Sequence, residues 1–378
     1  MISKKKFYIV LSLSLIIIGT LSFFSGVYSC LRESKLVRIE SLIKNYFSLD
    51  YDENKMIDTA AKGMTASLND PYSEYFTKEE FSMLLGYLGS SYSGIGIAVY
   101  YDQGQGGAVI ESVTEGSPAA NAGILAHDVI LSVDGKNITA DTFSSVVYYI
   151  RGLSNESLKD NAPMSFKIKR GSEIINLSIK RSTIELSTVE EKPYGDIYYI
   201  KLSEFAEKSP DDFKAAIMNA KKYKGLVLDL RNNGGGTVDS LNSIATQLLP
   251  KGLLFYTTDV SDKREDDYIN DNEYLDIPLV VLINGNTASA SEILSGAVKD
   301  YKRGLLVGET SYGKGLVQGV FNFPDGSGIK LTIAKYYTPS GAYINKKGIK
   351  PDMEIKASNS GTDDQLNYSL DYLKKLIK

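Results

Sequence analysis

A short serine-containing segment has the residue types that nucleophilic catalysis requires. It reads Asn286-Thr287-Ala288-Ser289-Ala290-Ser291-Glu292-Ile293. The apolar run before it predicts a buried strand, and the residues after it predict a helix that runs to about Tyr301. A serine on a sharp strand-to-helix turn exposes its hydroxyl, and the helix N-terminus favours negative charge beside it. Serine is also a preferred helix N-cap, so this segment alone favours a capping role for Ser289 and Ser291.

The composition limits the side chains that could take a proton from such a serine. The 378 residues include one histidine, His127, one cysteine, Cys30, and no tryptophan. A single cysteine excludes a disulfide within the chain, and one histidine with one cysteine cannot form the usual zinc site. We therefore expect no metal and no cofactor. A Ser-His-Asp hydrolase would need His127 as its base, and any other catalyst would use Lys, Asp, Glu or Tyr.

The length and the charge restrict the class of protein. A chain of 378 residues suggests two or three domains, and a composition of 43% hydrophobic and 23% charged residues is that of a globular protein. The formal net charge of −4 gives no attraction to nucleic acid over the whole chain, so no nucleic-acid partner is expected.

A second segment comes close to a phosphate-binding loop. It reads Gly308-Glu309-Thr310-Ser311-Tyr312-Gly313-Lys314-Gly315 and meets most of the pattern G-x-x-x-x-G-K-[ST]. Gly315 stands where a hydroxyl would bind Mg²⁺, and residues 316–323 have the pattern of a strand instead of the required helix. Nucleotide binding is therefore kept only as the least supported function of this segment.

The amino terminus has the pattern of a membrane anchor. Three lysines, Lys4 to Lys6, precede 21 uncharged residues from Phe7 to Val27, enough helix to cross about 30 Å of hydrocarbon. We expect an uncleaved transmembrane helix over residues 7–28, with residues 1–6 in the cytoplasm and the rest outside. A cleaved signal peptide and lipidation of Cys30 remain weaker alternatives.

The rest of the chain divides by its apolar periodicity. Residues 29–90 predict a helical region that breaks at Pro71 and resumes at a capping box formed by Thr77 and Glu80. Residues 91–182 predict short strands with two helical stretches, near 118–122 and 140–150.

From residue 183 onward strands and helices alternate. The continuous apolar runs 226–230 and 279–283 are typical of buried central strands, and the charged stretch 262–276 predicts a solvated loop. A second capping box, Thr362 with Gln365, predicts the start of a one-sided C-terminal helix within residues 357–378.

The segment 91–182 contains a turn suited to binding a peptide C-terminus. Consecutive backbone N–H groups in a glycine-containing turn can hold a carboxylate, and the strand that follows can accept an extended peptide. The peptide-binding candidates are Ser93, Gly94, Ile95, Gly96 and Ile97. With Gly116-Ser117-Pro118-Ala119-Ala120, Gly123-Ile124-Leu125 and Asp134-Gly135 downstream, the segment resembles a permuted PDZ domain of bacterial proteases. His127 then lies in a turn of a binding module, which removes it as a catalytic base.

The order of motifs along the chain resembles the C-terminal processing peptidases, also called tail-specific proteases, which are serine proteases of family S41 with a Ser-Lys dyad. The matching motifs are Asp70-Pro71-Tyr72-Ser73, residues 229–236, Ser289 to Ile293, Gly313-Lys314-Gly315 with Gln318, residues 336–341 and residues 348–352. The resemblance implies an α+β multidomain chain. Its parts would be the transmembrane helix, the N-terminal helical region, the PDZ domain, an α/β Ser-Lys protease core at 183–356 and the C-terminal helix.

The resemblance also implies roles for individual residues. Ser289 would be the nucleophile, Lys314 the general base and Gln318 the residue that orients the lysine. The backbone N–H of Ala290 and, by resemblance, that of Gly235 would bind the oxyanion. A lysine accepts a proton at neutral pH only if burial lowers its pKa from about 10.4. Arg151 matches an arginine thought to link peptide binding to opening of the active site, and a plain surface arginine is about as well supported.

The implied function is a serine endopeptidase anchored in a bacterial cell membrane, with its catalytic domain outside the cytoplasm. Its PDZ domain would bind protein substrates by their free C-terminal tails. The alternative is a catalytically inactive PDZ adaptor that only binds such tails. Family members often dimerise through terminal helices, and the apolar faces of residues 36–46 and 366–377 could form such a homodimer. The same faces could equally pack within one chain.

Overall fold

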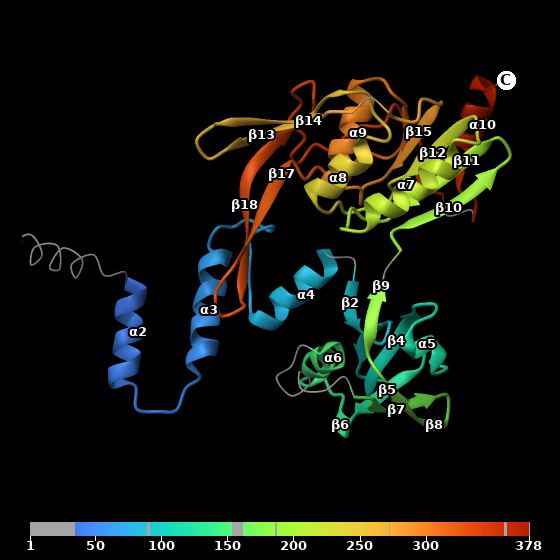
Figure 1. Cartoon of the computed structure of the whole chain (residues 1–378). Coiled ribbons are helices and arrows are strands. Elements are labelled where there is room, and N and C mark those ends of the chain that lie inside the picture. Colours follow the sequence, from blue (N-terminus) through green and yellow to red (C-terminus); the bar gives the residue numbers. More distant parts are fainter. Residues whose placement is uncertain are drawn as a thin grey trace, which may run out of the picture. The chain divides into compact units, whose positions relative to one another are not determined.

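The computed structural model describes residues 35–88, 91–152, 162–185, 187–271, 273–358 and 361–377. The expected anchor at residues 7–28 and Cys30 lie outside these ranges. Within the described ranges, none of the helices combines the length and the apolar character needed to cross a bilayer. The described part of the chain divides into two units, with the boundary between Ile57 and Asp58. The first contains helix α2 (Lys35–Tyr46) and the start of α3 (Glu53–Ala66) (Figure 1).

The predicted N-terminal helices are confirmed. After α3 the chain leaves the helix before Pro71, forms the short strand β1 (Glu74–Phe76) and re-enters a helix as α4 (Lys78–Leu88). The predicted capping box is present, because the N–H of Thr77 donates to the Glu80 carboxylate at 2.8 Å and the N–H of Glu80 donates to the Thr77 hydroxyl at 3.4 Å. Strand β1 was not predicted, since three residues are too few to show the alternation of apolar and polar residues that is typical of a strand.

The segment predicted as a PDZ domain forms its own sheet and core. Its elements are β2 (Ser91–Gly94), β3 (Ile97–Asp102), β4 (Gly107–Val113), α5 (Pro118–Asn121), β5 (Val129–Val133), β6 (Lys136–Asn137), α6 (Phe143–Arg151), β7 (Met164–Arg170), β8 (Glu173–Ile179) and β9 (Ser182–Glu185). The sheet has the order β3-β4-β5-β7-β8, with β6 on β5, and β2 pairs with β9. Its core includes Ile110, Ile130, Phe166 and Ile168, all without solvent exposure. The predicted strands and both predicted helices are therefore present.

A six-stranded sheet forms the centre of the C-terminal part. In spatial order its strands are β10 (Val189–Tyr194), β11 (Ile197–Leu202), β12 (Gly225–Asp229), β15 (Leu279–Ile283), β16 (Leu305–Gly308) and β19 (Met353–Glu354). Only β10 pairs antiparallel to its neighbour. Every residue of β12 and β15 is buried, as the two continuous apolar runs predicted.

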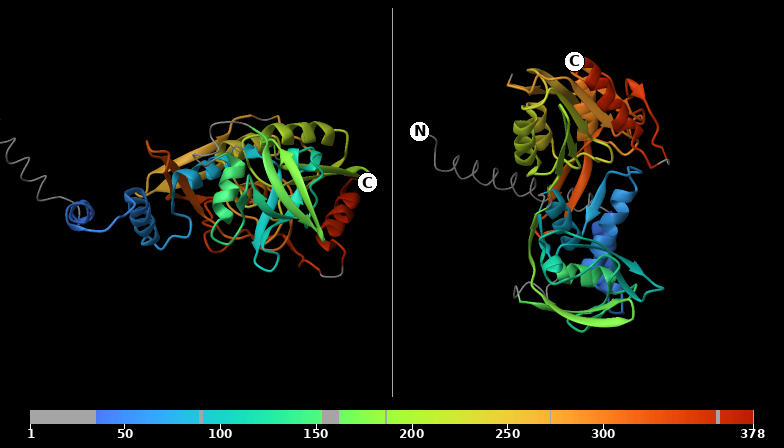
Figure 2. Two further views of the ribbon diagram at one scale, coloured as in Figure 1. Left: turned by 90° about the horizontal axis from the view of Figure 1, so that it is seen from below. Right: turned by 90° about the vertical axis from the view of Figure 1, so that its right-hand side faces the viewer.

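Helices cover both faces of this sheet. Leu226 and Leu228 of β12 share one cluster with residues of α7 (Ser209–Ala220), α8 (Val238–Ala245) and α9 (Ala290–Asp300). Val227, between them, faces the opposite side and shares a cluster with Leu370 and Leu373 of α10 (Asp364–Leu376). Figure 2 shows α10, in red, beside the sheet from two further directions. Because successive side chains of a strand point to opposite faces, both faces of the sheet are buried under helices.

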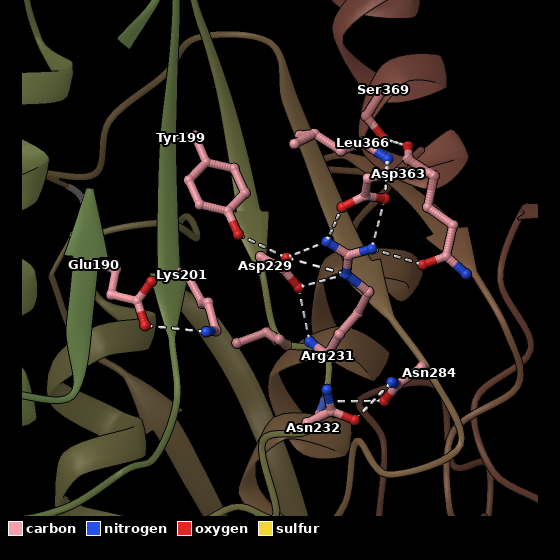
Figure 3. Close-up of polar contacts among 12 residues, drawn as sticks. Glu190, Tyr199, Lys201, Asp229, Arg231, Asn232, Asn284, Asp363, Leu366 and Ser369 are labelled. Atoms are coloured by element: carbon pink, nitrogen blue, oxygen red, sulfur yellow. Dashed lines mark hydrogen bonds and ion pairs between the residues drawn. The ribbon is translucent and has the colours of Figure 1, made fainter. Parts of the chain in front are cut away.

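A charged cluster connects α10 to the end of β12 (Figure 3). Arg231 donates to the buried Asp229 carboxylate at 2.6 Å and to the Asp363 carboxylate at 2.7 Å. Asp363 is also the N-cap of α10, since it accepts from the N–H of Leu366 at 3.0 Å. The predicted cap at Thr362 is therefore wrong by one residue, because the neighbouring carboxylate can bind Arg231 and the helix N-terminus together.

The second sheet corrects one prediction. It has the order β1-β18-β13-β14, with β17 on β18, where β13 is Gly252–Asp259, β14 Arg264–Ile269, β17 Leu316–Asn322 and β18 Gly328–Tyr337. Residues 262–276 were predicted as a loop, yet six of them form β14. This strand lies at the edge of the sheet, and its charges pair along it, Lys263 with Glu265 and Arg264 with Asp266. Edge strands commonly carry such charges, which hide the strand from an apolar pattern.

Packing of α10 gives a stability prediction. Leu373 has no solvent exposure, so Leu373→Ala should lower the free energy of unfolding by about 2–5 kcal/mol through lost contacts and a cavity. Leu376, on the same helix, is 53% exposed, and Leu376→Ala should change the free energy by less than about 0.5 kcal/mol. Urea titration followed by circular dichroism measures both. Equal shifts in the two variants would show that α10 does not pack on the sheet.

Candidate active site

The serine segment forms a strained turn between β15 and α9. Ser289 lies directly before Ala290, the first residue of α9, and has φ 58° and ψ −121°. A positive φ is uncommon for a residue with a side chain and is concentrated at functional sites. Ser289 is half-buried. Within the described residues the N–H of Ala290 donates to no carbonyl or side chain, as expected in the first turn of a helix. The turn therefore places a hydroxyl beside a free backbone donor.

The carboxylate of Glu292 joins this turn to the segment that contains Lys314. One of its oxygens accepts from the backbone N–H of Ser289 at 2.9 Å and from that of Lys314 at 2.8 Å. The other accepts from the Ser311 hydroxyl and the Gly313 N–H, both at 2.6 Å. Glu292 has no solvent exposure. These four donors compensate for the burial of the carboxylate, and they hold the serine turn next to the segment that contains Lys314.

The amine of Lys314 lies in a partly buried site. Burial lowers the pKa of Lys314, and the charge of Lys330 lowers it further, while the charges of Glu292 and Asp70 oppose the shift. The Nζ atom lies 5.0 Å from the centroid of the Tyr72 ring. In the described part of the chain no hydrogen bond joins this amine to Ser289 or Gln318. The backbones of Ser289 and Lys314 are thus held at one carboxylate, without a hydrogen bond between the two side chains in this part of the structure.

The glycine-rich loop after β12 is joined to the serine turn by asparagines. The N–H of Asn232 donates to the Asn284 side chain at 3.0 Å, and Asn284 donates back to the side chain of Asn232 at 2.9 Å (Figure 3). The carbonyl of Asn233 accepts from the N–H of Ala288 at 3.0 Å and from the hydroxyl of Ser291 at 3.1 Å. Ser291 therefore lies inside α9 and binds the glycine loop, so it does not cap the helix as the segment alone favoured.

Gly235 is placed against the serine turn. A Cβ at this position would lie 2.7 Å from Cβ of Ser289 and 2.9 Å from the backbone nitrogen of Ala290, and φ is +101°. Only glycine fits such an approach. Its N–H donates at 2.8 Å to the side chain of Asn233, two residues earlier. Its use as an oxyanion donor stays a prediction, and it would require Asn233 to release this N–H.

The peptide-binding candidates surround one cleft of the PDZ sheet. Gly94, Ile95, Gly96 and Ile97 line it together with Arg151 and with the apolar side chains of Val99, Val147 and Ile150. Ser93 directly precedes this set and is exposed. The structure thus places the predicted carboxylate-binding turn and the predicted regulatory arginine at the same groove.

Two further candidates from the sequence do not gain a chemical role. His127 has φ 71° and lies in the turn before β5 of the PDZ sheet. Residues 308–315 lead into the strand β17, whereas a phosphate-binding loop leads into a helix. The structure therefore gives no support to nucleotide binding.

The role of Glu292 can be tested by stability. In Glu292→Gln an amide nitrogen would face two of the four donors, and each donor left without an acceptor costs about 1–3 kcal/mol. We expect a clear fall in the midpoint of thermal unfolding. Glu309 is the matched control, because its carboxylate accepts one exposed N–H, that of Ala357. If Glu309→Gln lowers the midpoint as much, the Glu292 carboxylate does not hold the site together.

Three models of protein families match the chain. Residues 196–355 match peptidase family S41, residues 109–159 match a PDZ domain, and residues 28–80 match the N-terminal domain of the activating protease CtpB. The matches agree with the parts predicted from the sequence, namely the protease core, the PDZ domain and the N-terminal helical region.

Individual proteins are similar over most of the chain. A CtpA-like serine protease of Staphylococcus aureus is 36% identical over 332 residues, which are 85% of this chain and 65% of that relative. The chain thus spans slightly less than two thirds of that relative's length. The photosystem II D1 C-terminal processing protease is 31% identical, with 83% of this chain and 86% of that chain covered and a TM-score of 0.48.

A solved S41 protease from Bacteroides fragilis shares the fold, with a TM-score of 0.52, 19% identity and coverage of 90% of this chain and 97% of that chain. The three family models match the chain in the order N-terminal domain of CtpB, PDZ domain and peptidase family S41, so the chain contains an S41 peptidase domain preceded by a PDZ domain.

Proposed function

We propose that this protein is a serine endopeptidase in which Ser289 is the nucleophile and Lys314 the general base. The observation that carries the proposal is the Glu292 carboxylate, one oxygen of which binds the backbone N–H groups of both residues. A strained serine at a helix N-terminus and a lysine with a lowered pKa are thereby held at one site. This combination matches the requirements of acyl transfer.

The chemistry follows from these positions. Neutral Lys314 takes the proton of the Ser289 hydroxyl as its oxygen attacks the substrate carbonyl, and the N–H of Ala290 stabilises the oxyanion. The lysine then returns the proton to the leaving amine, and water hydrolyses the acyl-enzyme in the same way. Side-chain contact between Ser289 and Lys314 forms when substrate is bound, since catalytic hydrogen bonds are often incomplete in a free enzyme.

The proposed substrates are proteins with free C-terminal tails. The groove beside Ile95 and Ile97 offers an apolar pocket next to a turn with backbone donors, which suits an apolar C-terminal residue and its carboxylate. We propose that the PDZ domain captures such tails and that the core cleaves the chain to which they belong. Arg151 lines the same groove and is our candidate for coupling occupancy of the groove to activity.

The proposed location is a bacterial membrane, with the catalytic part outside the cytoplasm. It rests on the lysines at residues 4–6 and the uncharged stretch at residues 7–27. We also propose homodimerisation, because α2 exposes Leu36, Ile39 and Leu42 along one side. The alternative function is an inactive adaptor that binds tails without cleaving them. The complete set of Ser289, Lys314 and Gln318 favours the enzyme, since an adaptor has no use for it.

The dyad is tested with an unstructured protein that carries an apolar C-terminus. The full chain should cleave it, and Ser289→Ala and Lys314→Ala should each reduce the rate by at least about 100-fold, since each removes a group that acts on a proton or forms a bond. Lys314→Arg should be equally inactive, because guanidinium stays charged. Lys335→Ala, at an exposed lysine of β18, should keep full activity.

The outcomes separate the rival functions. Cleavage that survives in Ser289→Ala or Lys314→Ala would exclude the dyad, and an active Lys314→Arg variant would exclude a neutral base. Binding of the tail by the unchanged chain without any cleavage would favour the adaptor. Gel electrophoresis measures cleavage, and fluorescence anisotropy measures binding.

The glycine loop provides an independent test of the turn around Ser289. Gly235→Ala should abolish cleavage, because the new Cβ would lie 2.7 Å from Cβ of Ser289. Gly234→Ala is the matched control, since no atom lies within 4 Å of a Cβ at that position. We expect Gly234→Ala to cleave at a rate within about threefold of the unchanged chain, as its φ is not in the left-handed region. Comparable rates for both variants would show that the loop does not contact the active serine.

A further inference from the structure

The side chain of Gln318 is held by a hydroxyl on the neighbouring strand. Its amide nitrogen donates to the hydroxyl of Thr332 at 3.2 Å. The two residues face each other because β18 has a bulge at this point: Val317 pairs with Ala334 but Gln318 pairs with Thr332. Ile333 is the extra residue. Bulges often lie beside active sites, where they re-aim a side chain, and this one turns Thr332 toward Gln318.

The Thr332 hydroxyl is in turn bound to a carboxylate from the N-terminal region. It donates to Asp70 at 2.6 Å, a contact between residues 262 positions apart. The same Asp70 oxygen accepts from the Ser73 hydroxyl at 2.6 Å, and its other oxygen accepts from the Tyr72 N–H at 3.2 Å. Ser73 also accepts from the N–H of Thr332 at 3.0 Å, which extends the pairing of β1 with β18 by a side chain.

Asp70 is ionised at neutral pH. Burial opposes its ionisation, but the hydrogen bonds from Ser73, Thr332 and the Tyr72 N–H outweigh burial, so the pKa of Asp70 is lowered. An ionised carboxylate can only accept, which commits the hydroxyl proton of Thr332 to Asp70. The Thr332 oxygen must then accept, and the amide of Gln318 must present its nitrogen. The opposite orientation would bring two acceptors together.

We propose that Asp70, acting through Thr332, fixes the orientation of the Gln318 amide and thereby directs its carbonyl oxygen to the amine of Lys314. The inference rests on the proposed function. Asp70 and Thr332 are positioning residues, since neither touches the reacting atoms. The carbonyl oxygen of the Gln318 amide accepts a hydrogen bond from the lysine amine. Because the amide is neutral, it stabilises the protonated form of Lys314 less than a carboxylate would. The N-terminal region thus completes the active site of the core.

The threonine hydroxyl gives the sharpest test. Thr332→Val keeps the shape and removes the acceptor, so the amide of Gln318 loses its fixed orientation. We expect kcat to fall about 10- to 100-fold while KM changes less than about threefold, as for a misplaced catalytic group. Thr332→Ser keeps the hydroxyl and should restore kcat to within about threefold of the unchanged chain. A merely structural role would affect the two variants alike or would change KM and kcat together.

The aspartate gives a second readout, the pH profile. Activity needs neutral Lys314, so kcat/KM rises with pH through the pKa of Lys314. The charged or titratable groups near this amine are Asp70, Glu292, Lys330 and Tyr72. The negative charge of Asp70 raises the pKa of Lys314, so Asp70→Asn should move the midpoint of the profile to lower pH while kcat falls. An unchanged kcat and an unmoved midpoint would overturn the proposal.

A structural measurement separates failure of this proposal from failure of the proposed function. Crystal structures of the unchanged chain and of Thr332→Val should show the Gln318 amide bound to Thr332 in the first and turned away in the second. Loss of cleavage in Ser289→Ala tests the protease function by itself. If the unchanged chain cleaves but Thr332→Val keeps its kcat, the inference fails and the function stands. If the unchanged chain does not cleave, the function fails, and a Gln318 amide that has the same orientation in both crystals overturns the inference independently.

Discussion

The carboxylate of Glu292 lies where water is excluded, and the need to supply it with hydrogen-bond donors determines how the site is built. A buried charge without partners would cost several kcal/mol, roughly, so the surrounding chain has to supply donors. It supplies four, three of them backbone N–H groups. Two of these belong to Ser289 and Lys314. The four hydrogen bonds to one carboxylate therefore fix the separation of the backbone segments that carry Ser289 and Lys314, whatever the side chains of these two residues do.

Further polar contacts join the serine turn to the glycine loop and to α10. The serine turn is joined to the glycine loop through Asn233 and Ser291, and that loop begins at Arg231, which holds the N-terminus of α10 through Asp363. Each link is a polar group that must find a partner once it is buried or half-buried. The sheet supplies rigidity, and the ends of β12 and β15 supply the loops. This is the usual arrangement in open α/β folds, where sites lie beyond the carboxyl ends of the strands.

Sequence patterns predicted the local features and missed those that depend on distant contacts. The buried strands β12 and β15 and the Thr77 cap were predictable, because each is set by a continuous apolar run or by residues three positions apart. Strand β14 was not, since charges at a sheet edge mask its pattern. Glu292 could have been noticed as the glutamate three residues after Ser289, the spacing of a capping box. The bond between Asp70 and Thr332 leaves no such signal, because nothing local relates residues 262 positions apart.

That long-range bond bears on how such an enzyme could be controlled. The backbones of Ser289 and Lys314 are held in place, whereas the amine of Lys314 lies over the ring of Tyr72. Tyr72 and Asp70 belong to the same short segment, which also pairs with β18 through β1. A shift of this segment would therefore change the surroundings of the lysine and the orientation of Gln318 together. In the proposed mechanism both changes act on the same proton transfer, so one movement of this segment would alter activity more than either change alone.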